Sequence, residues 1–154
     1  MRRSRKRIID DTVLAMGSVE GVDISVSFGL GRRERDKVVP WSEVISMEVT
    51  CRLTYWNYKG VDALKVTLYR ALEFEDPAYV RDLEAVPLPH VGMLHTQKDL
   101  LRAFGDMPPW IFDSARATLT CGKPAYVLIH MTKPVRRRAW LRHLQFTTDR
   151  TELE

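Results

Sequence analysis

Cysteine is scarce in this sequence, which holds only Cys51 and Cys121 among its 154 residues. Small secreted domains that rely on a disulfide framework carry far more, so that class of protein is excluded. Both cysteines lie within apolar stretches. We therefore expect two buried free thiols in a reducing cytoplasm, with a single disulfide between them as the alternative.

Long apolar runs are also absent. No stretch approaches the roughly 18 residues that a membrane-spanning helix needs, and the basic N-terminus lacks the apolar core of a signal peptide. Hydrophobic residues at 45% and charged residues at 29% are typical of one globular domain. We expect a cytoplasmic protein, with peripheral attachment to the inner face of a membrane as the alternative.

Motifs that carry chemistry are missing too. The four histidines show no zinc-site spacing, and no glycine-rich phosphate loop occurs. Ser42 has no nucleophile elbow around it, and the acids Glu73, Glu75 and Asp76 are explained as a helix start. We expect no catalytic residue, no metal and no cofactor. An unrecognised enzyme is the alternative, and a deep pocket containing Glu73, His90 or His95 would indicate one.

Positive charge is concentrated in two blocks without acids, residues 2–7 and residues 133–142. Ten of the 24 basic residues lie there, so the remaining 14 stand against 20 acidic residues. The net charge of +4 therefore reflects two local patches rather than a uniformly basic surface.

Alternation of apolar and polar residues predicts several strands. Val22 to Phe28 alternates without a break after a turn bracketed by Gly17 and Gly21. Further strands are predicted at residues 8–16, 37–40, 43–52, 63–70 and 125–131. We expect most of them to pair as antiparallel neighbours.

Helical signals follow the fifth of these strands. Asp76-Pro77 supplies a capping acid and a proline at the first helical position. Thr96 with Asp99 resembles a capping box for a helix through Phe104. Pro108 and Pro109 begin another helix that Gly122 closes, and a terminal helix is predicted over residues 135–146.

These elements predict one α+β domain over residues 8–148, between a basic arm (1–7) and a short tail (149–154). The run from Lys37 to Glu48, with its Pro-Trp-Ser corner, resembles the central hairpin of bacterial PH-like domains. Residues 72–83 and 121–129 are similar to a group of small bacterial PH-like proteins of unknown function. The resemblance implies a curved antiparallel sheet or partial barrel with a small helical insertion and a C-terminal helix. It implies no ligand.

Two loops are the candidate partner sites. The first is a basic turn that suits phosphate groups, and the second places aromatic side chains at a turn, where they suit a partner or a membrane surface. The alternatives are a solvated turn and aromatics that fold back over an open barrel end. The candidate residues are Arg32, Arg33, Arg35, Lys37, Tyr55, Trp56, Tyr58 and Lys59.

Three functions remain open at this point. The first is a non-enzymatic module that binds a protein, in one form by strand addition at an open sheet edge. The second is peripheral binding to anionic lipid head groups through the two loops and the N-terminal arm. The third is nucleic-acid binding through the terminal basic blocks, where Arg136, Arg137 and Arg138 are candidate anion contacts. The oligomeric state is not indicated.

Overall fold

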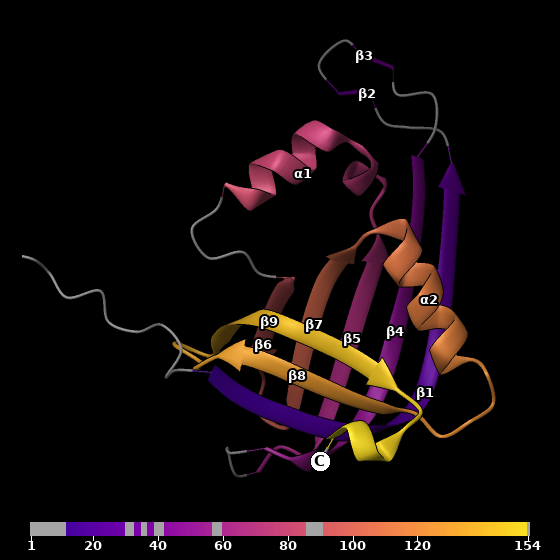
Figure 1. The fold of residues 1–154 in the computed structure, drawn as a ribbon. Coiled ribbons are helices and arrows are strands. Elements are labelled where there is room, and N and C mark those ends of the chain that lie inside the picture. Colours follow the sequence, from indigo (N-terminus) through magenta and orange to yellow (C-terminus); the bar gives the residue numbers. More distant parts are fainter. Residues whose placement is uncertain are drawn as a thin grey trace, which may run out of the picture.

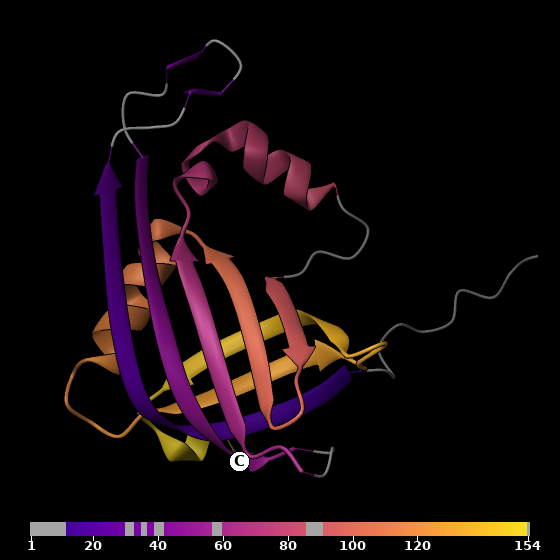
Figure 2. The same cartoon turned by 180° about the vertical axis from the view of Figure 1, so that it is seen from behind.

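The computed structural model of the chain describes residues 12–29, 33–34, 37–38, 42–56, 60–85 and 91–153. Seven of the described strands form a closed barrel in the order β1-β4-β5-β7-β6-β9-β8 (Figures 1 and 2). These strands are β1 (Thr12–Gly29), β4 (Ser42–Tyr55), β5 (Ala63–Arg70), β6 (Gly92–Thr96), β7 (Leu100–Met107), β8 (Tyr126–Thr132) and β9 (Arg138–Thr147). The α+β fold class is confirmed at this level.

Strand β1 closes the barrel because it is long and bent. Its first part pairs with β8, and from Met16 onward it pairs with β4. The register slips next to Gly17 and again between Val19 and Gly21. A Cβ atom at Gly17 would collide with the carbonyl oxygen of Arg52, so only glycine fits this bend. One continuous strand thus replaces the two strands and the turn predicted from the sequence.

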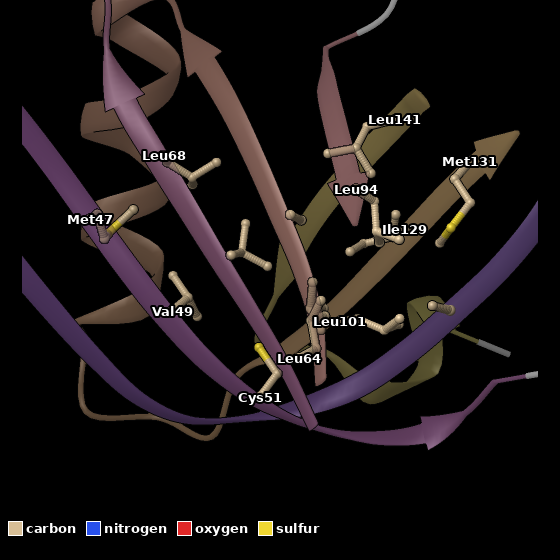
Figure 3. Close-up of a cluster of buried hydrophobic side chains, with 14 of the residues drawn as sticks. Met47, Val49, Cys51, Leu64, Leu68, Leu94, Leu101, Ile129, Met131 and Leu141 are labelled. Atoms are coloured by element: carbon tan, nitrogen blue, oxygen red, sulfur yellow. The ribbon is translucent and has the colours of Figure 1, made fainter. Parts of the chain in front are cut away.

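The barrel interior is an apolar core. Alternate residues of the strands point inward and are fully buried, as the labelled side chains in Figure 3 show. Cys51 lies among them, as predicted, and burial raises the pKa of its thiol to about 12. Cys121 is exposed, so the expectation of two buried thiols was wrong for this residue, which lies past the end of a helix.

Helix α2 (Pro109–Leu119) packs against the barrel through Phe112, which is 1% exposed. Figure 1 shows this helix lying across the side where β1 and β4 rise past β8 and β9. It begins at the predicted prolines, and Gly122 follows its end with a φ of 81°. Helix α1 (Pro77–Glu84) stands over one mouth of the barrel after the short 3-10 helix η2 (Leu72–Glu75). A second 3-10 helix, η3 (Arg150–Leu153), follows β9.

Three further predictions about secondary structure were wrong. The segment predicted as a terminal helix forms β9, and the segment predicted as a helix from Thr96 to Phe104 forms the end of β6, a turn and most of β7. The sheet is also not purely antiparallel, because β5 and β7 run parallel. In the two segments predicted as helices, barrel pairing supplies backbone hydrogen bonds that outweigh a weak helical pattern.

Candidate functional site

Helix α1 leaves its apolar side unpacked over the barrel mouth. Asp76 caps the helix by accepting a 2.9 Å hydrogen bond from the backbone N–H of Ala78, as the Asp-Pro signal predicts. The apolar residues Tyr79, Val80 and Leu83 are only half-buried, and the helix has no fully buried residue. A short helix with this pattern is stable only when something covers its apolar side.

A cleft of about 580 Å³ separates α1 from the barrel. Its walls come from η2 and α1, the start of β6, the end of β7, the start of α2 and the middle of β9. Most of the lining is apolar. The lining residues are Phe74, Tyr79, Val80, Leu83, Glu84, Val91, Gly92, Asp106, Met107, Pro108, Ile111, Arg142, His143 and Leu144.

A smaller hollow of about 230 Å³ lies beside the cleft, along α2 and β9. Met107, Ile111 and Leu144 line both spaces, so the two are neighbours. Together the two hollows reach from α1 to Phe146.

Polar groups also line the cleft. Burial raises the pKa of Asp106, and the nearby carboxylate of Glu73 raises it further. Arg142, from β9, lines the same space, and no acid in the described part of the chain forms an ion pair with it. The cleft therefore joins an apolar wall to the guanidinium group of Arg142 and to two carboxyl groups, those of Glu84 and Asp106, of which Asp106 is more readily protonated than usual.

The first predicted loop falls mostly outside the described residues. Arg32 and Arg35 lie outside them, while Arg33 and Lys37 belong to a two-stranded sheet of β2 (Arg33–Glu34) and β3 (Lys37–Val38). Lipid or phosphate binding by this loop stays a prediction.

The two described residues of the aromatic loop differ in exposure, and each fits a different expectation. Tyr55 ends β4 and is 46% exposed, whereas Trp56 is half-buried and packs against the core. Trp56 thus follows the alternative in which the aromatics fold back over the barrel. Tyr58 and Lys59 lie outside the described residues.

Arg136 and Arg137 form the two central positions of a tight turn between β8 and β9. Val135 and Arg138 exchange backbone hydrogen bonds of 2.8 and 3.0 Å across it, and the φ angles of the two arginines are 50° and 66°. These residues were expected before or within a helix. A hairpin turn that presents them at an exposed tip takes its place.

Of the three residues expected to mark an enzyme, the two that the structure describes do not line the cleft. Glu73 does not line it but acts on Asp106, His95 lies on the outer wall of the barrel, and His90 is outside the described residues. Within the described ranges, no three metal-ligating side chains come together. His130 and His143 pair across β8 and β9 with ring centroids 5.6 Å apart.

Comparison with family models, with curated proteins and with solved structures finds no match for this chain. In the part of the chain that the structure describes, no helix has the length and apolar character needed to cross a membrane.

Sequence reasoning missed the cleft because its walls come from six elements that are distant along the chain. Asp106 was interpreted only as part of a helix start, and Arg142 only as part of a basic block. The unsatisfied apolar side of residues 77–84 was the one signal in the sequence that pointed toward the site.

Proposed function

We propose that this domain is a binding module that holds an elongated apolar molecule with an anionic end, such as a fatty acid, in the cleft beneath α1. The observation that carries the proposal is the mostly apolar cleft of about 580 Å³ with Arg142 on its wall. Ligand sites of about 300–1,000 Å³ are typically apolar with a few polar groups that fix orientation.

Burial of apolar surface supplies the driving force for such binding. Val80 and Leu83 of α1 face Ile111 of α2 and Leu144 of β9 across the cleft. An aliphatic chain between them would remove all of these side chains from water, at about 25 cal/mol for each Å². The ligand would also give α1 the packing partner that the barrel does not provide.

Arg142 supports the choice of an anionic end. A guanidinium group pairs with a carboxylate in a bidentate manner, and such a bond is stronger inside a partly dry cleft than in water. Asp106 repels an anionic ligand when it is ionised. Because the pKa of Asp106 is raised, the protonated, neutral form of this carboxyl group persists to higher pH than usual.

Fluorescence titration with dansylated undecanoic acid tests the proposal. Val80→Trp fills the cleft and should weaken binding more than about tenfold, which corresponds to about 1.4 kcal/mol. Asp82→Trp adds the same side chain at an exposed position of α1 that does not line the cleft, and it should leave affinity within about twofold. Equal binding by both variants would contradict the site.

The methyl ester of the same probe isolates the role of Arg142. Arg142→Met should weaken binding of the acid by about tenfold and leave binding of the ester unchanged, because only the acid forms a charged hydrogen bond. Loss of both ligands would show that the arginine acts through packing rather than through charge.

A second candidate function, binding of a protein partner, rests on the free edge of β1. Beyond Ser18, β1 pairs with β4 but with no other described strand, so its backbone groups from Val22 to Gly29 can accept a further strand. Ile24 and Val26 are 42% and 67% exposed there. They share a face with the buried residues of β4 but project past the barrel core.

The partner that fits this edge best is a second copy of the chain. Antiparallel self-pairing centred on Ser25 places Ile24 against Val26 of the other copy and Asp23 against Ser27, so no like charges meet. Sedimentation velocity should show a dimer that Val26→Lys abolishes. Val44→Lys, at an exposed position on the opposite face of the hairpin, is the control that should keep it.

The relation to bacterial PH-like domains remains a proposal at the level of the curved barrel. The short strand β3 leading toward β4 supports it, as the resemblance of residues 37–48 implies. The predicted terminal helix is not part of that proposal, because β9 takes its place. We likewise propose a cytoplasmic location.

A further inference from the structure

A row of basic side chains crosses four neighbouring strands on the outer wall of the barrel. Arg138 of β9 pairs with His95 of β6, His95 pairs with Arg102 of β7, and Arg102 pairs with Lys65 of β5. Their neighbours along each strand, including Leu94, Leu101 and Leu64, are fully buried. Side chains alternate along a strand, so all four basic residues point outward.

This row is poorly neutralised. Lys65 lies 3.5 Å from the carboxylate of Glu48, but Arg102 and Arg138 form no ion pair with any acid in the described ranges. Like charges at directly opposite positions of neighbouring strands destabilise a sheet. A row of this kind keeps an electrostatic cost that a bound polyanion would remove.

The hairpin tip extends the row at its β9 end. Arg136 and Arg137 sit at the two positive-φ positions of the turn, which glycine or asparagine normally occupy. Each arginine there costs about 1–2 kcal/mol relative to ordinary backbone. The carbonyl oxygen of Arg137 accepts a 2.9 Å hydrogen bond from the N–H of Thr96, which fixes the tip beside the end of β6.

An aromatic and apolar row runs next to the basic one. Trp140 pairs with Met93, Met93 with Phe104, and Phe104 with Thr67, each two residues along its strand from a member of the basic row. Trp140 is 48% exposed, and the ring of Phe104 meets that of His95 edge to face at 6.1 Å.

We propose that this face of the barrel binds single-stranded nucleic acid, with the phosphates along the basic row and the bases over Trp140 and Phe104. Sites for single strands combine a basic track with flat side chains on which unpaired bases stack. Met93 and Phe104 are half-buried and do not protrude, which favours stacking over insertion into a membrane. This proposal is independent of the cleft, which lies at the barrel mouth.

Fluorescence anisotropy with a labelled 20-nucleotide oligo(dT) tests the proposal. The full-length protein should bind it, with a log–log salt slope of roughly −2 if about three phosphates are contacted. Arg102→Gln combined with Arg138→Gln should weaken binding at least tenfold and reduce the slope by about 1.4. Arg81→Gln combined with Arg116→Gln removes two exposed helix arginines instead, and should change affinity less than twofold.

Three results would overturn the proposal. They are no complex at low salt, equal weakening by the two double variants, and binding to vesicles with 30% phosphatidylserine while the oligonucleotide stays free. Trp140→Leu separates stacking from charge, because it should weaken binding without changing the salt slope.

Discussion

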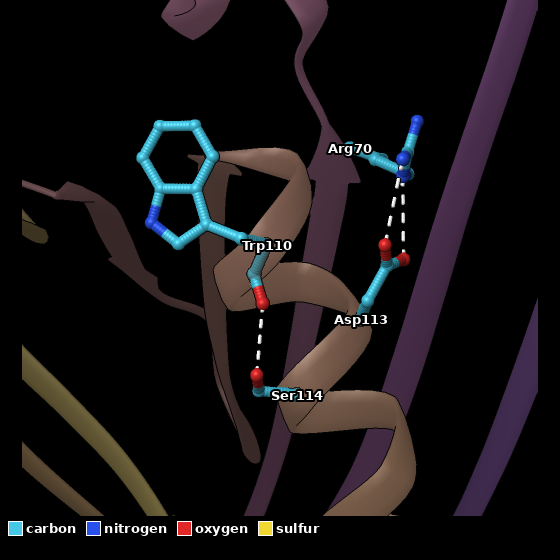
Figure 4. A network of polar contacts seen from close by, with 4 residues as sticks. All are labelled: Arg70, Trp110, Asp113 and Ser114. Atoms are coloured by element: carbon cyan, nitrogen blue, oxygen red, sulfur yellow. Dashed lines mark hydrogen bonds and ion pairs between the residues drawn. The ribbon is translucent and has the colours of Figure 1, made fainter.

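Arg70, at the end of β5, donates two hydrogen bonds to the carboxylate of Asp113 on α2, with N–O distances of 3.3 and 3.4 Å (Figure 4). One turn of the same helix is reinforced by Ser114, whose hydroxyl donates to the carbonyl oxygen of Trp110 at 2.9 Å. The ion pair connects α2 to the barrel beside the buried ring of Phe112. Two kinds of contact therefore hold the helix that forms one wall of the cleft.

The ion pair should matter less than the aromatic ring. The side chains of Arg70 and Asp113 are 25% and 50% exposed, so solvent weakens their attraction. Asp113→Asn should lower the free energy of unfolding by about 1 kcal/mol or less, whereas Phe112→Ala should lower it by about 3–5 kcal/mol. Urea unfolding of both variants checks the order, and a larger loss for Asp113→Asn would contradict it.

The bend of β1 should not tolerate a side chain at Gly17. Gly17→Ala brings a Cβ atom into the backbone of Arg52, and the strand must shift to relieve the collision. We expect a loss of about 1–3 kcal/mol in the free energy of unfolding. Gly21→Ala is the matched control, because nothing lies within 4 Å of a Cβ atom there. Similar losses in the two variants would show that the bend is not specific to Gly17.

The two cysteines should differ in reactivity. The pKa of Cys51 is raised to about 12 by burial and by the nearby Glu20, so at about pH 8 roughly one thiol in ten thousand is ionised. Cys121 is exposed. Iodoacetamide should therefore add one label to the native protein and two after denaturation, as intact mass spectrometry would show. Rapid labelling of native Cys51 would mean that the core opens readily.

Asp106 should make stability depend on pH. Its pKa is raised above the ordinary 3.8, so the stability contributed by its neutral form is present below that value and is lost as pH rises through the raised pKa. Asp106→Asn stays neutral throughout. The variant should be more stable than the natural protein at about pH 7 and equal to it at about pH 3, by chemical unfolding. A variant that is less stable at neutral pH would show that the carboxylate makes a favourable contact.

Local signals in the sequence predicted local structure well. The Asp76-Pro77 pair predicts the start of α1, the prolines at 108 and 109 predict the start of α2, and the apolar run at residues 125–131 predicts β8. In each case the signal depends on hydrogen bonds or burial within a few residues. Tertiary contacts did not need to override it.

The errors arose where both faces of a strand carry apolar residues. Trp140, Leu141 and Leu144 suggested a helix face, but Leu141 points into the core while Trp140 lies on the outer wall beside Met93. Phe104 likewise lies on the outer side of β7, opposite Met93. An outer apolar row hides the period of two that identifies a strand.

Neither the basic row on the outer wall nor the exposed edge of β1 could be predicted from the sequence. Lys65, Arg102 and Arg138 are far apart along the chain, and only the register of β5, β7, β6 and β9 aligns them. The alternation of Val22 to Phe28 was recognised, but the exposure of its apolar side chains was not, because β1 and β4 extend past the barrel. Both outcomes depend on closure of the barrel, which no local pattern determines.

Methyl chemical shifts under titration with lauric acid test the cleft most directly. The methyl groups of Val80, Leu83, Ile111 and Leu144 should shift progressively and to saturation, since they line the cleft. Those of Leu64 and Val66, deep in the barrel, should stay in place. Arg142→Met should move the titration midpoint to about tenfold higher concentration. Unchanged cleft methyl groups at saturating lauric acid, or shifts confined to the exposed edge at Ile24 and Val26, would contradict the proposed function.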